Sequence, residues 1–150
     1  MKKYIGTKII EAVPAIRKGG KVYEKDQPIP KSMDPVEEGY KVRYPDGYES
    51  FSPKDVFEAA YRETDCLSFG LAIEAAKKGK RIARRGWNGK NQYVELAEHI
   101  SYENAAHEVV DANHEAIGNK ALAFAGTSGV QLGWLASQAD MLADDWMIVE

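Results

Sequence analysis

The chain has 150 residues, of which 44% are hydrophobic and 29% charged. This composition is globular and excludes a disordered or fibrous chain, and the length suffices for one ordinary domain or two small ones. The net charge is −3, so we expect no binding to nucleic acid. The chain has no apolar run as long as a membrane span and no signal-peptide core, so we expect a cytoplasmic protein that does not bind a membrane. The single cysteine, Cys66, excludes an internal disulfide and is interpreted as a small buried hydrophobe or a bystander.

The first part of the chain predicts strands. Residues 4–13 favour a strand that Pro14 ends or moves to a sheet edge, and residues 21–23 suggest a short second strand. Residues 26–38 contain three prolines and are expected to form a surface loop.

A hairpin and a helix are predicted next. Alternating residues flank the turn Pro45-Asp46-Gly47. Ser52 fits a helix N-cap and Pro53 the first helical position, with the helix reaching Tyr61. The pattern restarts near Asp65, so the sequence predicts an N-terminal hairpin-plus-helix module, 1–65, and a second module, 66–150.

The second module begins with a helix over 69–78, capped by Ser68 and ended by Gly79. Asn88-Gly89 is the strongest hairpin signal in the chain, between strands 80–87 and 92–97. The polar stretch 101–119 is expected to be a loop or excursion. The remaining predicted elements are strands 120–125 and 130–135, a helix over 138–143 capped by Ser137, and a strand over 146–149. The fold class is α+β, with small antiparallel sheets and packed helices in two modules.

Charge is distributed unevenly. Residues 1–65 carry 12 basic and 12 acidic side chains, and residues 66–150 carry 8 and 11. Seven of those 8 basic residues lie between Lys77 and Lys90, where they would attract a compact anion. Helix-end lysines and a solvated strand face explain the same pattern equally well.

Catalytic and metal motifs are incomplete. His107-Glu108 lacks the second histidine of a zincin helix, and Gly126, Gly129 and Gly133 form neither a dinucleotide fingerprint nor a P-loop. Aspartates 140, 144 and 145 would suit acid–base chemistry or a divalent ion, but Asp140 is also the acid expected in a first helical turn. We therefore predict no catalytic residue, no metal site and no cofactor.

The Trp87-Asn88-Gly89-Lys90 turn is the best candidate for a ligand surface. An indole face stacks on nucleobases, guanidinium and ammonium groups bind phosphates, and an amide both donates and accepts hydrogen bonds. Trp134 and Trp146 lie in the same module, and each tryptophan taken singly is more often a core residue.

Three segments in one order carry a resemblance to a known family. They are residues 69–80, residues 84–90 (Arg-Arg-Gly-Trp-Asn-Gly-Lys) and residues 134–146 (Trp-Leu-Ala-Ser-Gln-Ala-Asp-Met-Leu-Ala-Asp-Asp-Trp). They resemble the second Thoeris anti-defence family of phages, over about residues 67–150. The resemblance implies a non-enzymatic homo-oligomer, expected to be a tetramer in the host cytoplasm, that sequesters cyclic ADP-ribose isomers. Some members of the family also hold cyclic dinucleotides.

The resemblance also assigns roles. Trp87 and Trp134 would stack on bases, Arg84, Arg85 and Lys90 would bind phosphates, and Asn88, Gln138 and Asp140 would bond to ribose or base. Ser137 maps onto the last motif, and Trp146 fits a core position or a ligand contact. The N-terminal module and an insertion-like stretch near 100–130 set this chain apart from the smallest members. Two other functions stay open: a module that binds and inhibits a host protein, and a metal-dependent nucleotide hydrolase using Asp140 or Asp144.

Overall fold

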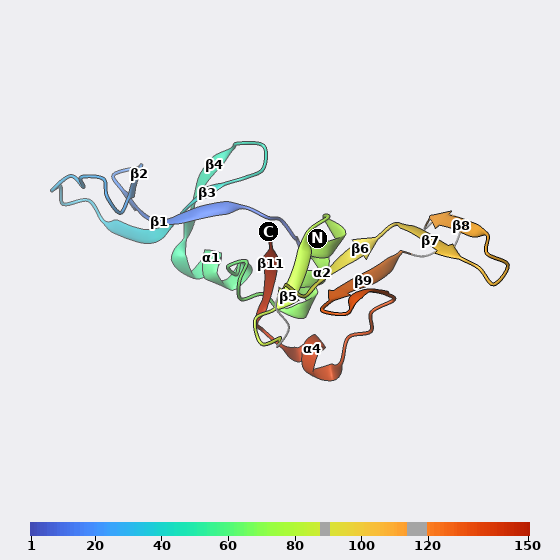
Figure 1. Ribbon diagram of the computed structural model, residues 1–150. Helices are drawn as coiled ribbons and strands as arrows, with labels where there is room; N and C mark the ends of the chain where they lie inside the picture. The colour runs from blue at the N-terminus through green and yellow to red at the C-terminus, as the bar shows by residue number, and fades with distance from the viewer. Residues whose placement is uncertain (88–90, 114–119) are drawn as a thin grey trace. The chain divides into compact units, whose positions relative to one another are not determined.

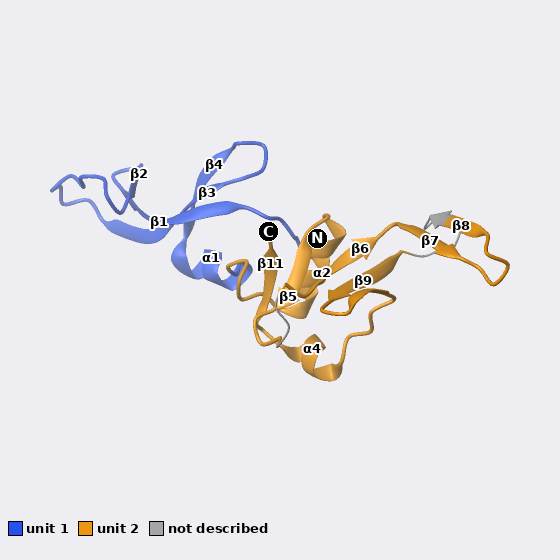
Figure 2. Cartoon of the chain, viewed as in Figure 1, with its two compact units in different colours: residues 1–62 blue, residues 63–150 orange. Residues whose placement is uncertain are grey.

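The computed structural model describes residues 1–87, 91–113 and 120–150. They form two compact units, Met1–Arg62 (unit 1) and Glu63–Glu150 (unit 2), whereas the sequence pattern places the module boundary after Asp65 (Figure 2). Antiparallel strands and short helices make up both units, which confirms the α+β class (Figure 1). None of the helices in the described ranges is long and apolar enough to cross a membrane.

Unit 1 contains a four-stranded antiparallel sheet. The short second strand and the hairpin predicted from the sequence are both confirmed. The loop expected over 26–38 ends earlier than predicted, because the next strand already begins at Val36. In sheet order the strands are β2 (Lys21–Glu24), β1 (Glu11–Lys18), β3 (Val36–Arg43) and β4 (Glu49–Pro53).

The strand predicted over 4–13 is wrong for residues 4–10, because β1 begins only at Glu11, and Pro14 lies inside β1 and does not end it. It is paired with Tyr40 of β3, while the pairing of β1 with β2 begins only at Ala15. At Pro14 the strand is therefore paired on one side only. A proline, which has no N–H to donate, is tolerated at such an edge position, so the other alternative holds.

The β3–β4 turn follows its predicted chemistry. The Gly47 N–H donates to the Tyr44 carbonyl at 2.9 Å, and Gly47 adopts a positive φ of 87°, which glycine takes without a steric cost. The helix that follows, α1 (Lys54–Ala60), has Pro53 as its N-cap and no side-chain cap. The prediction that Ser52 caps it is wrong, because Ser52 still belongs to β4 and pairs with Tyr40.

Helix α2 (Phe69–Lys77) of unit 2 forms as predicted. The Ser68 hydroxyl accepts a hydrogen bond from the Leu71 N–H at 3.4 Å, which satisfies one of the unpaired donors at the helix N-terminus. Gly79, at a φ of 88°, follows the C-terminus. The predicted cap and stop are therefore both confirmed.

The sheet of unit 2 has five antiparallel strands, against which α2 packs through its buried alanines. The strands predicted over 80–87 and 130–135 form over shorter ranges. In sheet order the strands are β10 (Gly129–Leu132), β9 (Ala121–Gly126), β6 (Tyr93–Ala97), β5 (Arg81–Arg84) and β11 (Trp146–Val149). The core cluster consists of Leu67, Ala72, Ala75, Ala76, Ile82, Val94 and Trp146.

A further hairpin occupies part of the stretch expected to be a loop or excursion. Strands β7 (His99–Glu103) and β8 (Val109–Asn113) pair as a two-stranded ribbon that continues from the end of β6 (Figure 1). Of the two alternatives for 101–119, the loop is therefore wrong where these strands lie, while an excursion from the sheet fits them. The insertion-like interpretation of 100–130 also needs correction, because it includes β9, which pairs with β6 and β10 inside the sheet.

Cys66 is exposed, and its thiol contacts the Glu63 carbonyl at 3.6 Å. The interpretation as a small buried hydrophobe is wrong, and the bystander interpretation remains.

Candidate ligand-binding site

The three tryptophans of unit 2 form one cluster. The Trp87 ring centroid lies 5.4 Å from that of Trp146 and 6.1 Å from that of Trp134, and all three pairs meet edge to face. The Phe124 ring centroid lies 5.5 Å from that of Trp87, also edge to face. Such pairs contribute about 0.5–1.5 kcal/mol beyond the area they bury. We call Trp87, Trp134, Trp146 and Phe124 the aromatic cluster.

Burial separates the members of this cluster. The Trp146 side chain is completely buried and donates its indole N–H to the Asp140 carbonyl at 2.8 Å, so Trp146 is a core residue. Trp87 and Trp134 are only half-buried. Of the three indoles, these two therefore keep surface for a ligand, in line with the stacking role that the family resemblance implies for them.

Local backbone structure places each half-buried ring. Trp87 follows β5, and its N–H donates to the Arg84 carbonyl at 3.2 Å. Trp134 follows β10, where Gly133 has a φ of 87° and the N–H groups of both residues donate to the Leu122 carbonyl, at 2.8 and 2.9 Å. Both rings are thus carried by hydrogen-bonded turns attached to the ends of sheet strands.

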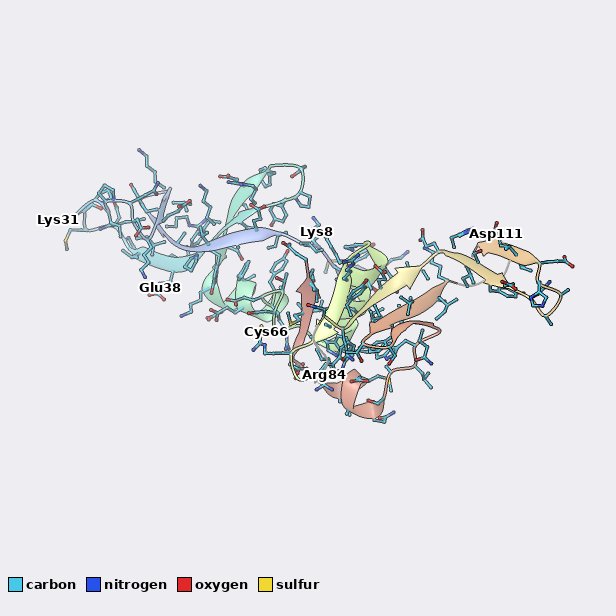
Figure 3. The ribbon with its side chains drawn as sticks, viewed as in Figure 1. Lys8, Lys31, Glu38, Cys66, Arg84 and Asp111 are labelled. Carbon is cyan, nitrogen blue, oxygen red and sulfur yellow. The ribbon has the colours of Figure 1, made fainter. Side chains whose placement is uncertain are left out.

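An ion-pair network lies beside the cluster. Arg84, labelled in Figure 3, donates from Nε to Asp145 at 2.9 Å and from Nη1 to Asp140 at 3.0 Å. These hydrogen bonds raise the pKa of Arg84, and the bond from Arg84 is the main cause that lowers the pKa of Asp145. We call Arg84, Asp140 and Asp145 the Arg84–aspartate network. Its guanidinium already binds two carboxylates, and the assignment of Arg84 to a ligand phosphate stays a prediction.

Asp140 is held by the start of helix α4 (Gln138–Leu142). The Ser137 N–H donates to its Oδ2 at 3.2 Å and its own N–H donates to the Ser137 hydroxyl at 3.1 Å, which is a capping box. The predicted Ser137 cap is therefore confirmed. Burial acts to raise the pKa of Asp140, but hydrogen bonds from Arg84 and Ser137 outweigh it and hold this pKa below its usual value.

Of the remaining predicted site residues, the structure describes Arg85 and Gln138, and neither has a hydrogen bond, ion pair or ring contact with the aromatic cluster. Arg85 is exposed and bonds to the carbonyl and, at 3.6 Å, the carboxylate of Asp65, while Gln138 is exposed in the first turn of α4. Asn88 and Lys90 lie outside the described residues. The structure thus brings together Arg84, Trp87, Trp134, Ser137, Asp140 and Trp146.

Ion pairs account for much of the basic segment. Lys77 pairs with Glu74, Arg81 with Glu95, Arg84 with two aspartates and Arg85 with Asp65. Acidic partners therefore neutralise several of the seven basic residues that suggested an anion site. This favours the interpretation of a solvated, paired face for those positions.

Phe124 connects the cluster to an open hollow of about 210 Å³ between the β9–β10 turn and β6. A Cβ at Gly126 would lie 2.7 Å from the Phe124 ring, so a larger residue there would force this ring to shift. The sequence favours turn and close-approach roles for Gly126, Gly129 and Gly133, but it gives no sign of the hollow. Its lining residues are Gln92, Phe124, Gly126, Thr127, Ser128, Gly129, Val130 and Gln131.

Sequence reasoning also missed the role of Asp145. Its Oδ2 accepts the Gly86 N–H at 3.1 Å, so it contacts the turn that carries Trp87 as well as Arg84. No local motif could have indicated this, because Asp145 and Arg84 are 61 residues apart. Within the ranges that the structure describes, no cluster of three His, Cys, Asp or Glu side chains is arranged to hold a metal ion.

Comparison with known proteins places this site in a family. Residues 67–149 match the Thoeris anti-defense 2-like domain. A relative named Thoeris anti-defense 2, from Bacillus phage SP01, is 35% identical over 86 residues, a match that covers 55% of this chain and 94% of that relative. The matched range contains every predicted site residue and lies inside unit 2. The chain therefore belongs to the Thoeris anti-defense 2-like family of phage anti-defence proteins.

Proposed function

We propose that unit 2 binds and sequesters a cyclic nucleotide-derived immune signal without degrading it. Cyclic ADP-ribose isomers are the first candidates and cyclic dinucleotides the second. The observation that carries the proposal is the pair of half-buried indoles, Trp87 and Trp134, held on hydrogen-bonded turns within the range that matches the family. Indole faces in such positions stack on nucleobases whatever the base.

The Arg84–aspartate network favours binding over hydrolysis. Asp140 is one of the two aspartates that the hydrolase alternative uses, but both of its oxygens accept hydrogen bonds and its pKa is lowered. A carboxylate that stays ionised and is already bonded is a poor proton donor near neutral pH. The hydrolase alternative is thereby reduced to Asp144, and we expect the signal to be released intact.

Apolar side chains on the surface of unit 2 suit an interface. Leu135 is 90% exposed and Leu142, in α4, is 78% exposed. Exposed apolar side chains are common singly, but a set of them favours a protein contact. We assign this contact to further copies of the chain, in a homo-oligomer expected to be a tetramer. A host protein that co-purifies in a fixed ratio, with no nucleotide, would instead support the inhibitor alternative.

The test is capture followed by release. Purified protein is incubated with cyclic ADP-ribose isomers and cyclic dinucleotides, washed and heated, and the released compounds are identified by mass spectrometry. We expect an unaltered signal to be recovered in proportion to protein. Signals that stay in solution, or that return as hydrolysis products, would contradict the proposal.

Trp87→Ala is the matching variant. Loss of a stacked ring should weaken capture by about 1–3 kcal/mol. Because Trp87 also packs against Phe124 and Trp146, Trp87→Phe retains a ring in the aromatic cluster and should weaken capture less. Tyr102→Ala, which removes an exposed aromatic ring from β7, is the control and should leave capture unchanged. Equal effects of Trp87→Ala and Tyr102→Ala would show that the Trp87 face does not bind the signal.

A further inference from the structure

The backbone that carries Trp87 is bonded to the segment preceding β11. Arg84, the last residue of β5, pairs with Trp146, the first residue of β11. Past the end of both strands the Arg85 N–H still donates to the Asp145 carbonyl at 3.1 Å. Asp145 is therefore beside the residues that lead from the sheet to Trp87.

The Asp145 carboxylate contacts two points of this segment. Its Oδ1 accepts from Arg84 Nε at 2.9 Å, and its Oδ2 accepts from the Gly86 N–H at 3.1 Å. A Cβ at Gly86 would lie 3.2 Å from Oδ2, so a larger residue there would press on the Asp145 carboxylate. Two short bonds from one charged group restrict the backbone immediately before Trp87 more than a single neutral bond would.

Asp140, in the first turn of α4, contacts the same Arg84-to-Trp87 segment. Its Oδ1 accepts from Arg84 Nη1 at 3.0 Å and faces the Trp87 indole N–H at 3.5 Å. The indole contact is at the outer limit of a hydrogen bond, so the Arg84 contact is the stronger one. Arg84 thereby links the Asp140 and Asp145 carboxylates. Asp145 in turn bonds to the Gly86 N–H, and Asp140 faces the Trp87 indole N–H.

Charge in the network argues for an internal role of Arg84. One guanidinium faces two carboxylates, so the group carries a net charge of about −1, and the Arg84 side chain is only 21% exposed. A ligand phosphate there would meet two anions close to its single cation. The arrangement suits orientation of a neighbouring ring better than anion binding.

We propose that Asp145 is a positioning residue, which acts through Arg84 and Gly86 to hold the Trp87 ring at the angle that stacks on the signal. The ligand part of this proposal rests on the proposed function. Asp145 itself does not touch the ligand. Misplacement of a binding ring by a fraction of its size reduces stacking even when the ring remains present.

The experiment uses Asp145→Asn in the full-length protein. This change keeps the size of the side chain but removes its charge, and with it the charge-assisted bond to Arg84. The ligand-free readout is the NMR resonance of each tryptophan indole N–H. We expect the Trp87 resonance to shift most, and the resonance of buried Trp146, whose ring meets Trp87 edge to face, to shift less.

Binding is then measured with cyclic ADP-ribose and cyclic di-GMP as probes. We expect Asp145→Asn to weaken binding of the captured probe on the order of fivefold, the effect of one lost hydrogen bond. Asp111→Asn, the same chemical change on exposed β8, is the control and should alter neither readout. Should Asp145→Asn shift the Trp146 resonance as much as the Trp87 resonance, Arg84→Lys tests the same contact from its other side, because lysine keeps the charge and loses the two-point geometry.

An unmoved Trp87 resonance in a folded variant would overturn the proposal. A shifted Trp87 resonance with unchanged probe binding would also overturn it, since the ring angle would then not matter. If the unaltered protein binds neither probe, the proposed function fails and the ligand part of the inference fails with it. The indole resonance alone still decides whether Asp145 holds the ring.

Discussion

The two units differ in what stabilises them. Among the described residues of unit 1, the buried apolar side chains are Ala15 and Val42, whereas unit 2 buries Ile82, Val94 and Trp146 beneath the alanines of α2. Burial of apolar surface is the main stabilising term in folding, at about 25 cal/mol per Å². The unit that carries the candidate site therefore has the larger core, and we expect it to be the more stable of the two.

Polar contacts differ in the same way. In unit 1 the ion pairs, such as Arg17–Glu37 at 2.6 Å and Lys41–Glu24 at 3.1 Å, lie on side chains that are about 35–44% exposed. Exposed pairs contribute little, because water and salt screen them. In unit 2 the Arg84–aspartate network is more buried, at 16–32% exposure. These ion pairs of unit 1 thus cover a surface, while the Arg84–aspartate network of unit 2 fixes a geometry.

Trp146→Ala should have the largest effect. It leaves a cavity where α2 meets the sheet and removes the ring contacts to Trp87 and Phe69, so we expect unit 2 to lose about 3–5 kcal/mol of unfolding free energy. All three tryptophans lie in unit 2, so denaturant unfolding followed by tryptophan fluorescence reports on this unit alone. Hydrogen exchange of the β1 and β3 amides in unit 1 should stay unchanged.

The matched control is Val42→Ala, which removes buried side-chain volume from unit 1. It should accelerate hydrogen exchange in β1 and β3 and leave the fluorescence transition in place. If Trp146→Ala also accelerated exchange in β1 and β3, the two units would not be separate in stability.

Gly39→Ala should have an intermediate effect, confined to unit 1. An added Cβ would lie 2.2 Å from the Ser52 carbonyl oxygen and 2.5 Å from the Phe51 ring, so β4 has to shift. We expect a cost of about 1–3 kcal/mol, measured as faster exchange in β3 and β4. Gly70→Ala in α2 is the control: nothing lies within 4 Å, and alanine should stabilise that helix by about 0.5–1 kcal/mol. Equal behaviour of the two variants would show that the Gly39 contact is not tight.

Elements governed by local chemistry were predicted well from the sequence. The Ser68 cap, the Gly79 stop and the Pro45-Asp46-Gly47 turn each depend on residues within one turn of each other, and all three form. The Ser52 cap failed because pairing with β3 extends β4 to Pro53. Pairing between β3 and β4 thus outweighed the local helix-cap signal, and a local sequence pattern does not reveal such pairing.

The candidate site was predictable only in part. Its tryptophans stood out by residue type and by resemblance, and Trp87 and Trp134 do meet. The partners of Arg84 did not stand out, because Asp140 and Asp145 are 56 and 61 residues away and the fold alone brings them beside β5. The β7–β8 hairpin was missed for a different reason: β7 does alternate polar and apolar residues, but it is only five residues long, mostly exposed and next to a polar stretch, which favours a loop.

Acid should have the smallest effect, and it should act on unit 2 through the network. The pKa values of Asp140 and Asp145 are lowered in the folded protein, so their stabilisation is complete above the unfolded value of about 3.9 and is lost as pH falls through the folded pKa values. Fluorescence-detected unfolding should therefore become easier below about pH 4. In Asp145→Asn this acid dependence should be weaker, because one titrating carboxylate is gone, while Asp111→Asn should retain it. An identical acid profile in Asp145→Asn and the unaltered protein would mean that the Arg84 pair does not contribute to the stability of unit 2, and the contrast with the exposed pairs of unit 1 would then fail.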